Sequence, residues 1–243
     1  MEGAVARWYA RLTKKSMEEF RILARRVAAQ VPSGVRVLEV APGPGYFAIE
    51  LAKQGNYDVT GLDISRTFVE IAQNNATEAR VKVKFLHGNV ADMPLADQSF
   101  DFVLCRAAFK NFSEPVRALQ EMYRVLKPGG KALIIDLRRD ASMDSIRTAV
   151  KDMHFNAVDR FITTMTFRHM LLRRAYTRRG FEEMISRTRF QNASVDENPI
   201  GLEILLSKPG DDFMSWAYFT LYGASWQTSG TSHEMSSATT FIH

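Results

Sequence analysis

The segment before residue 32 carries apolar side chains at helical spacing. Leu23, Ala24 and Val27 are three of them, and arginines lie mostly between the apolar positions. Such a period places the apolar side chains on one face of a helix. Pro32-Ser33-Gly34 comes next, a composition that ends helices. The pattern therefore predicts that residues 1–31 are largely helical.

From residue 35 onward, short apolar runs alternate with helical patterns. The predicted strands span residues 35–40, 58–62, 81–86, 100–105 and 131–137, and the predicted helices span residues 46–53, 65–76 and 113–126. Strands that alternate with helices are typical of βαβ units, in which helices cover both faces of a parallel sheet. Two further strands, 190–195 and 201–206, follow each other directly across a turn, which predicts an antiparallel hairpin. We therefore expect an α/β fold with a Rossmann-like, doubly wound sheet of seven strands, mostly parallel.

The alternation is interrupted between residues 140 and 175, where the pattern is helical and rich in Met and Phe. One more helix is predicted over residues 177–186. After Lys208-Pro209-Gly210 the composition becomes aromatic and then rich in Ser and Thr, without a pattern that indicates structure. We therefore divide the chain into N-terminal helices (1–31), a main domain (32–209) with a helical cap (about 140–175), and a tail (210–243).

Composition narrows the possible functions. The chain has 243 residues, of which 46% are hydrophobic and 24% charged, and its formal net charge is +5. Cys105 is the sole cysteine, so an intramolecular disulfide is excluded and no zinc-ligand set is present. The sequence shows no signal peptide and no apolar run of the roughly 20 residues that span a bilayer. We expect a cytoplasmic protein without a metal, and the oligomeric state is left open.

The first predicted strand runs into a glycine-containing turn. Gly43-Pro44-Gly45-Tyr46-Phe47-Ala48 fits the dinucleotide fingerprint G-x-G-x-x-A, and Asp63 follows about twenty residues later, where a ribose-binding acid belongs. Glu39 argues against a dinucleotide, because a carboxylate just before the turn would repel a pyrophosphate. It would suit a ligand that carries an ammonium and a sulfonium. The turn therefore favours S-adenosylmethionine.

Five motifs together resemble the class I S-adenosylmethionine-dependent methyltransferases, in particular the small-molecule branch that includes ubiquinone- and menaquinone-type C-methyltransferases. They are Val37-Leu38-Glu39-Val40-Ala41-Pro42-Gly43-Pro44-Gly45, Gly61-Leu62-Asp63-Ile64-Ser65, Gly88-Asn89-Val90-Ala91-Asp92-Met93-Pro94-Leu95, Ser99-Phe100-Asp101 and Arg124-Val125-Leu126-Lys127-Pro128-Gly129-Gly130. The resemblance covers residues 30–140 well, 140–208 loosely and the tail not at all. It implies a cofactor site across the ends of the first, second and fourth strands.

The resemblance assigns the methionine end of the cofactor to the first motif. Glu39 would bind or orient the amino group, and the alternative is that it only accepts hydrogen bonds from loop amides. The turn backbone of Ala41, Pro42, Gly43 and Gly45 would lie under the methionine. The family usually has glycine where Ala41 stands, and we expect Ala41 to keep a negative φ because alanine is strained at positive φ.

The remaining cofactor contacts follow the next strands. Asp63 would accept hydrogen bonds from both ribose hydroxyls, and Ile64 would pack on the adenine ring unless it is a core residue. Asn89 stands where the family usually has aspartate, and would accept from the adenine amino group while the Val90 amide meets a ring nitrogen. Asp92 is the alternative to Asn89. Cys105 and Arg106 would lie beside the sulfonium, with Cys105 as a buried apolar residue.

The acceptor side is less defined by motifs. Lys110 lies in the loop where family members often face the substrate, and Phe155, Phe161 and Met165 are candidates to line an apolar chamber under the cap. His154 is our candidate for a general base, although alignment of the reacting groups supplies much of the acceleration in a methyl transfer.

We expect methyl transfer from S-adenosylmethionine to O, N or C of a small, partly hydrophobic molecule, with S-adenosylhomocysteine as the second product. Two alternatives are a non-methylating S-adenosylmethionine-binding protein of the same fold and an RNA or other nucleic-acid methyltransferase. The many arginines between residues 160 and 190 would suit nucleic acid, or form a solvated helix face. The Asn/Asp-Pro-Pro-aromatic motif of amino-methylating nucleic-acid enzymes is missing after the fourth strand, which argues against nucleic acid. Among the alternatives, a nicotinamide-dependent oxidoreductase is the one that Glu39 supports least.

Overall fold

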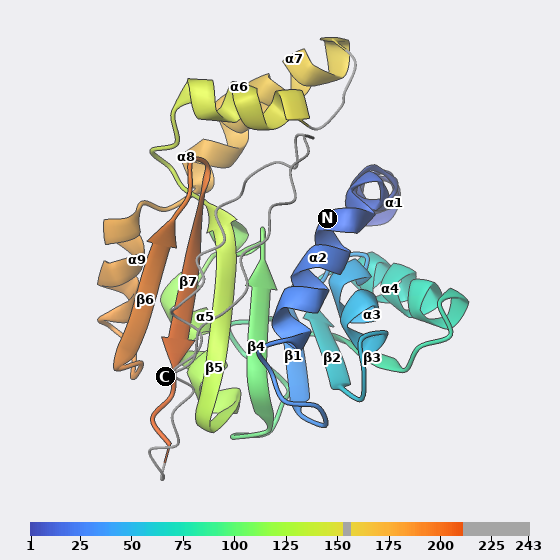
Figure 1. Cartoon of the computed structure of the whole chain (residues 1–243), viewed down its shortest axis with the longest axis vertical. Helices are drawn as coiled ribbons and strands as arrows, with labels where there is room; N and C mark the ends of the chain where they lie inside the picture. Colours follow the sequence, from blue (N-terminus) through green and yellow to red (C-terminus); the bar gives the residue numbers. More distant parts are fainter. Residues whose placement is uncertain (153–156, 211–243) are drawn as a thin grey trace, which may run out of the picture.

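The computed structural model describes residues 1–152 and 157–210. One seven-stranded sheet runs through the molecule in the order β3-β2-β1-β4-β5-β7-β6 (Figure 1). Its strands are β1 (Arg36–Val40), β2 (Asp58–Asp63), β3 (Val83–His87), β4 (Phe100–Arg106), β5 (Leu126–Leu137), β6 (Asn192–Glu197) and β7 (Gly201–Ser207). Strands β1 to β5 pair in parallel, whereas β7 pairs antiparallel with both β5 and β6. The predicted seven-stranded α/β fold with its closing hairpin is confirmed.

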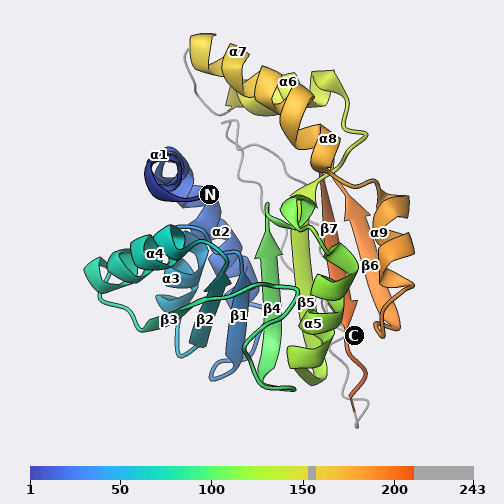
Figure 2. The ribbon, with the colours of Figure 1, turned by 180° about the vertical axis from the view of Figure 1, so that it is seen from behind.

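Helices cover both faces of the sheet (Figure 2). One face carries α2 (Met17–Ala28), α3 (Tyr46–Ala52) and α4 (Arg66–Glu78), and the other carries α5 (Pro115–Val125) and α9 (Arg178–Ile185). Successive strand residues serve opposite faces: Val37 packs under α2 and α3, and its neighbour Leu38 packs on the α5 side. Both side chains are fully buried. This double burial explains why the strands read as continuous apolar runs.

Two groups of helices lie beyond the ends of the parallel strands (Figures 1 and 2). The first is α1 (Gly3–Thr13), which a short 3₁₀ turn, η1 (Lys14–Ser16), joins to α2. The second contains α6 (Met143–Asp152), α7 (Ala157–Thr166), a π-helical turn η3 (Phe167–Leu171) and α8 (Leu172–Arg174). The predicted cap is therefore helical but built from several pieces. It has its own small core of Ile146, Val150, Phe167 and Leu172.

Several predicted boundaries were wrong by a few residues. Strand β5 begins at Leu126 rather than residue 131, because Phe100 pairs with Leu126 before an irregularity in the ladder. Helix α5 begins at Pro115, whose fixed φ suits the first helical position. Strand β6 begins at Asn192, two residues later than the apolar pattern predicted. Residues 211–243, most of the predicted tail, lie outside the described residues.

Candidate functional site

The carboxyl ends of β1, β2, β4 and β5 meet at one edge of the sheet (Figure 1). β1 lies between β2 and β4, so the chain winds outward in opposite directions from the β1–β4 pair. Loops leaving adjacent strands toward opposite faces open a crevice, and ligands of open α/β sheets bind there. Most of the predicted cofactor residues lie at the ends of β1, β2 and β4 or directly after them, whereas Asn89 and Val90 follow the neighbouring strand β3.

The turn after β1 is shaped by left-handed residues. Gly43 has a φ of 54° and Gly45 a φ of 77°, which glycine adopts at little cost. A Cβ on Gly45 would come within 2.6 Å of the Phe85 ring, so the turn also needs the absence of a side chain. Ala41 has a φ of 53°. The expectation of a negative φ at Ala41 was wrong: its amide donates to the Leu62 carbonyl at 2.8 Å, and this link to β2 holds the strained conformation.

Glu39 is buried at the end of β1, with only 4% of its surface exposed. Its Oε2 accepts a hydrogen bond from the Ala48 amide at 3.0 Å, in the first turn of α3. Burial raises the pKa of Glu39 to about 8, against the lowering effects of that amide and of Arg106. Within the described part of the chain Glu39 forms no ion pair. A cationic group beside this carboxylate would favour its ionised form.

Asp63 ends β2 with both oxygens engaged. Oδ2 accepts from the Gly43 amide at 3.0 Å and Oδ1 from the Ser65 amide at 2.8 Å. The side chain therefore ties the β1 turn to the start of α4, while Ser65 caps that helix through the Phe68 amide. Burial raises the pKa of Asp63, although both amide hydrogen bonds lower it. Each carboxylate oxygen keeps a second lone pair for a ligand.

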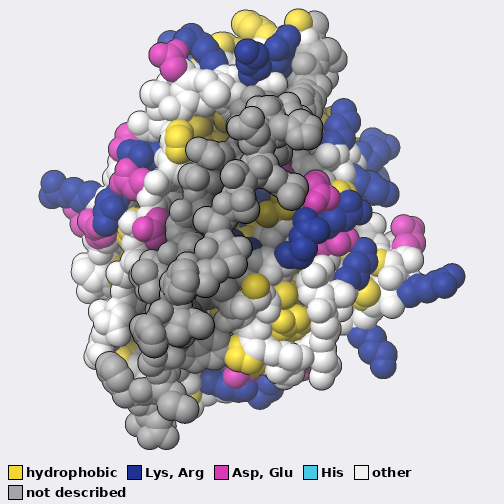
Figure 3. All heavy atoms as spheres, viewed as in Figure 1, with side chains coloured by type: hydrophobic (Ala, Val, Ile, Leu, Met, Phe, Trp, Pro, Cys, Tyr) yellow, Lys and Arg dark blue, Asp and Glu magenta, His cyan; other side chains and the backbone are white. Residues whose placement is uncertain are grey.

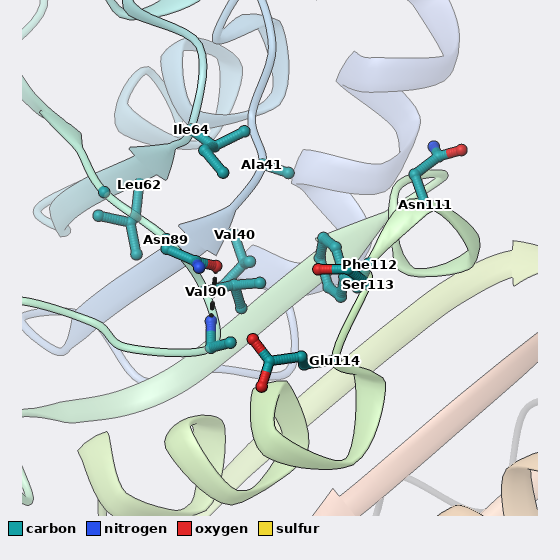
Figure 4. Close-up of a pocket in the computed structure, with 12 residues that line it drawn as sticks. Val40, Ala41, Leu62, Ile64, Asn89, Val90, Asn111, Phe112, Ser113 and Glu114 are labelled. Carbon is teal, nitrogen blue, oxygen red and sulfur yellow. Dashed lines mark hydrogen bonds between the residues drawn. The ribbon is translucent and has the colours of Figure 1, made fainter.

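A pocket opens beside Asp63, and Figure 4 shows its lining side chains. Ile64, Asn89 and Val90, which the resemblance assigned to the adenine, line this pocket together, and Ile64 is 64% exposed rather than a core residue. Asn89 Oδ1 accepts from the Ala91 amide at 3.0 Å, which fixes the amide side chain in place. Asp92 is exposed and does not line this pocket.

The opposite side of the pocket comes from residues that the sequence analysis missed. They belong to the segment between β4 and α5 and are Asn111, Phe112, Ser113 and Glu114. Their contribution follows from the pairing of β1 with β4, which brings this segment beside the β2 end. The sequence signal for this side of the pocket was the polar pair Ser113 and Glu114, directly before the start of α5 at Pro115.

Cys105 and Arg106 end β4. Cys105 is fully buried, and burial raises the pKa of its thiol, in agreement with an apolar packing role. Arg106 lies under the N-terminal helices: its Nη2 is 2.7 Å from Glu19 Oε2, and its guanidinium lies 4.6 Å from the centre of the Phe20 ring. Arg106 thus connects the strand end to α2.

Lys110 does not face open space as the predicted substrate role requires. It belongs to a short 3₁₀ turn, η2 (Phe109–Asn111), and only 7% of its surface is exposed. Its Nζ lies 2.7 Å from Asp136 Oδ1, and its amide donates to Asp136 Oδ2 at 2.9 Å. The physical reason is that Asp136, buried at the end of β5, needs a compensating cation. The sequence analysis missed Asp136, although an acid at the end of the apolar run Ala132–Leu137 was a signal of the same kind as Glu39.

Helix α1 is held over the same edge by contacts that the sequence analysis also missed. The Glu2 carboxylate accepts from the amides of Arg66 and Thr67, at 3.0 and 3.1 Å, and so caps α4. The Tyr46 hydroxyl donates to the Ala10 carbonyl at 2.9 Å. Tyr9 packs edge-on against Phe68, and burial raises the pKa of its hydroxyl.

The cap places the acceptor-side candidates in different environments. Phe161 is 66% exposed and Met165 is partly buried. His154 and Phe155 lie outside the described residues. Among the residues that the structure describes, no cluster of His, Cys, Asp or Glu could hold a metal ion, and no helix is long and apolar enough to cross a membrane.

Comparisons with known proteins find similarity to methyltransferases over a little under half of the chain. A family model described as a methyltransferase domain matches residues 38–134. Demethylmenaquinone methyltransferase from Deinococcus radiodurans is 36% identical over 108 residues, which cover 44% of this chain and 45% of that protein. The chain thus spans a little under half the length of this relative.

Solved structures share the fold over more of the chain. A putative S-adenosyl-L-methionine-dependent methyltransferase from Methanococcus maripaludis has a TM-score of 0.65 at 20% identity, covering 86% of this chain and 94% of the other. The cyclase SpnF has a TM-score of 0.53 at 21% identity, covering 78% and 81%. At these identities the similarity concerns the fold alone.

Proposed function

We propose that this chain is a class I S-adenosylmethionine-dependent methyltransferase and that it methylates a small, partly hydrophobic acceptor of the quinone type. The observation that carries the proposal is the meeting of Glu39, Asp63 and Asn89 at one edge of the sheet, around a glycine turn and a pocket. The identified relative acts on a demethylmenaquinone, which supports the acceptor class.

The residues at this edge fit S-adenosylmethionine. Glu39 is a buried carboxylate with a raised pKa, one amide donor and no ion pair within the described chain, so its surroundings favour a cationic ligand group. A Cβ on Gly43 would meet nothing within 4 Å, which leaves room for a ligand beside the turn backbone. The exposed Ile64 offers an apolar surface to an adenine ring, and Asn89 offers an acceptor.

Each residue would have one task. Glu39 would hold the amino group, Asp63 the ribose hydroxyls, and Ile64, Asn89 and Val90 the adenine. The cofactor would supply an activated methyl group on a sulfonium, for displacement by the acceptor atom. Cys105 and Arg106 would border that position.

The chain's own contribution to rate would be alignment and exclusion of water. The Lys110–Asp136 pair fixes the loop after β4 against β5, and Arg106 fixes α2 over the same strand end. Helix α1 and the cap would enclose the acceptor between them. A general base would come from His154 or would not be required.

The test is binding followed by turnover. Titration calorimetry with S-adenosylmethionine should show Asp63→Ala binding weaker by about 1–3 kcal/mol, because hydrogen bonds to a charged group are lost. Asp92→Ala is the matched control and should bind normally, since Asp92 is exposed, whereas Asp63 is buried and bonded to the β1 turn through the Gly43 amide. Normal affinity in a folded Asp63 variant would contradict the assignment, and so would an equal loss of affinity in the Asp92 variant.

Turnover is tested with a demethylated quinol acceptor and detection of S-adenosylhomocysteine by mass spectrometry. The second candidate function is a non-methylating reaction on the same scaffold, which the similarity of fold to a cyclase keeps in view. It would give cofactor binding without S-adenosylhomocysteine for any acceptor. A nucleic-acid substrate has less support, because Arg178 and Arg179 pair with Glu182 and Glu183 on their own helix.

A further inference from the structure

Helix α1 turns an apolar stripe away from the protein. Its buried side consists of Ala6 and Ala10, which pack toward α3 and α4. Val5, Trp8 and Leu12 lie three and four residues apart on the other side and are 55%, 57% and 37% exposed. Single exposed apolar residues are ordinary, whereas a stripe that includes a tryptophan marks a surface that contacts something apolar.

A second apolar surface lies on the cap. Phe161 and Ile162 in α7 are 66% and 56% exposed, and Met170 in η3 is 46% exposed. Both views of the ribbon place α1 and α7 at the same end of the molecule, beyond the carboxyl ends of the parallel strands (Figures 1 and 2). The two apolar surfaces therefore lie at the end of the molecule that holds the candidate site.

Basic side chains surround both surfaces. The segment from residue 1 to 15 contains four basic residues and one acid, Glu2, which already caps α4. The segment from 160 to 174 contains four arginines and no acid. All eight basic residues are exposed, namely Arg7, Arg11, Lys14, Lys15, Arg160, Arg168, Arg173 and Arg174. Figure 3 shows hydrophobic and basic side chains together over the α6–α7 end.

We propose that α1 and α7 form a docking surface for an anionic phospholipid membrane, with the apolar side chains in the headgroup region and the basic ones against lipid phosphates. Amphipathic helices with Trp, Phe and Leu on one face and Lys or Arg beside them bind bilayers in this way. Anionic headgroups complement the basic side chains electrostatically. A second copy of the chain would place like charges opposite each other, which is unfavourable. Four of the six exposed apolar side chains, Val5, Leu12, Ile162 and Met170, are not aromatic and offer a nucleic acid neither stacking nor hydrogen bonds, so the surface as a whole favours a bilayer.

The surface also has a consequence that rests on the proposed function. A partly hydrophobic acceptor dissolved in the bilayer would reach the candidate site from the end of the molecule that faces the membrane. Docking itself involves neither cofactor nor acceptor.

The experiment measures sedimentation of the full chain with vesicles of phosphatidylcholine alone and of phosphatidylcholine mixed with phosphatidylglycerol. The protein should sediment with the mixed vesicles, and high salt should release it. The double variant Trp8→Ser/Phe161→Ser should lose at least roughly tenfold in partitioning. The variant Arg11→Gln/Arg168→Gln should lose about fivefold per charge removed.

Two control variants match these changes elsewhere on the surface. Ile22→Ser removes an apolar side chain that is 55% exposed on α2, and Arg178→Gln/Arg179→Gln removes two charges from α9. Both should partition as the unchanged protein does. A further readout uses Trp216→Phe/Trp226→Phe, which leaves Trp8 as the sole tryptophan. The fluorescence emission of Trp8 in this variant should shift to shorter wavelength when mixed vesicles are added, and should not shift with phosphatidylcholine vesicles.

Several results would overturn the proposal. The first is absence of binding to mixed vesicles, and the second is a loss of partitioning in the control variants equal to that in the surface variants. The third is vesicle binding that the surface substitutions leave unchanged. The fourth is the formation of dimers or RNA complexes, in the absence of vesicle binding, that the surface substitutions abolish. Because the assay contains neither cofactor nor acceptor, its failure would leave methyl transfer untouched. Conversely, a protein that shows no methyl transfer would still bind mixed vesicles if the docking surface is as proposed.

Discussion

Three buried acids, each at the end of a parallel strand, organise the candidate site through backbone amides. Glu39 receives the Ala48 amide, Asp63 the amides of Gly43 and Ser65, and Asp136 the amides of Lys110 and Leu137. Each carboxylate therefore holds a loop in shape at the position where a ligand would lie. Loss of any of these carboxylates would disturb both the loop and its ligand contacts.

Glu39→Gln tests the electrostatic part of this arrangement. A carboxyl whose pKa is raised to about 8 contributes stability that is fully present below its ordinary pKa of 4.5 and is lost as the pH rises through 8. Glutamine keeps the acceptor for Ala48 and does not ionise. We compare the free energies of unfolding of Glu39→Gln and the unchanged protein, measured with urea in the absence of cofactor. Their difference should grow in favour of the variant by about 1.4 kcal/mol per pH unit between the ordinary pKa of 4.5 and the raised pKa of about 8.

The unchanged protein should bind S-adenosylmethionine more tightly as the pH rises from 6 to 8, because Glu39 ionises in this range and attracts the cationic ligand. Glu39→Gln should bind the cofactor more weakly and show a smaller rise, because a neutral amide does not ionise. Glu78→Gln, in α4, is the control for the loss of an acid elsewhere. A pH dependence of stability that is identical in Glu39→Gln and the unchanged protein would contradict the role of Glu39.

Ala41→Gly tests the strained turn. At a φ of 53°, alanine costs about 1–2 kcal/mol relative to its right-handed conformation. Glycine removes that cost but loses more chain entropy on folding than alanine does. We expect a net gain of roughly 0.5–1 kcal/mol in the free energy of unfolding, measured by chemical denaturation. Ala41→Val should be destabilised, since β-branched residues tolerate this region least. Equal stability of the two variants would show that position 41 carries no strain.

At the scale of elements, the Lys110–Asp136 pair joins the loop after β4 to the end of β5. Its side chains are 5% and 1% exposed. Lys110→Met should lower the free energy of unfolding by about 3–5 kcal/mol, because Asp136 would be left buried without a cation. Lys127→Met is the matched control: Lys127 and Asp101 also lie 2.7 Å apart, but at 33% and 29% exposure, so the loss should be about 0–1 kcal/mol.

A double variant separates the charge from the packing in this pair. Lys110→Met/Asp136→Leu removes both charges and should recover much of the stability that Lys110→Met loses. If the double variant is as unstable as the sum of the two single variants, the pair is not coupled as the geometry indicates.

Glu2 attaches helix α1 to α4, together with the Gly3 amide, which donates to Thr67 Oγ1, and the packing of Tyr9 on Phe68. The hydrogen bonds from Thr67 lower the pKa of Glu2, so the attachment is present above its ordinary pKa and weakens as the pH falls through the lowered one. Glu2→Ala should release α1 and speed trypsin cleavage at Arg7 and Arg11 at neutral pH. Glu18→Ala, which removes an exposed acid of α2, should leave cleavage there unchanged. Equal cleavage rates in Glu2→Ala and the unchanged protein would show that α1 is held by its other contacts.

At the scale of the whole molecule, the sheet with its first five strands would bind the cofactor, and the cap would select the acceptor. Met165, partly buried in α7, is the test position. Met165→Ala should reduce kcat/KM for the acceptor by roughly tenfold, the effect of a few methylenes in an apolar pocket, while the Kd for S-adenosylmethionine stays within a few fold. A fall in Tm with unchanged kinetics would place Met165 in the small core of the cap.

Much of this protein could be predicted from local pattern. Continuous apolar runs separated by helical periods are enough to specify strands that are buried on both faces, and hence a parallel sheet under two layers of helices. A ligand crevice at the carboxyl ends of the strands is general for open parallel sheets, whereas the strand order is given by the pairing itself. The carboxylates Glu39 and Asp63 could be predicted as site residues because each lies at the end of an apolar strand, where a buried charge is unusual.

Tertiary structure alone decided which side chains face one another. Asp136 and Lys110 are 26 residues apart, and Glu2 and Thr67 are 65 apart, so no local period relates them. Whether Lys110 meets solvent or a buried acid depends on the register of β4 against β5. The φ of Ala41 depends on a hydrogen bond to β2 in the same way. A local pattern records whether a side chain is to be buried, because burial is a property of one residue on one element. Which partner compensates a buried charge is a property of two elements packed together, and only the folded chain brings that pair into contact.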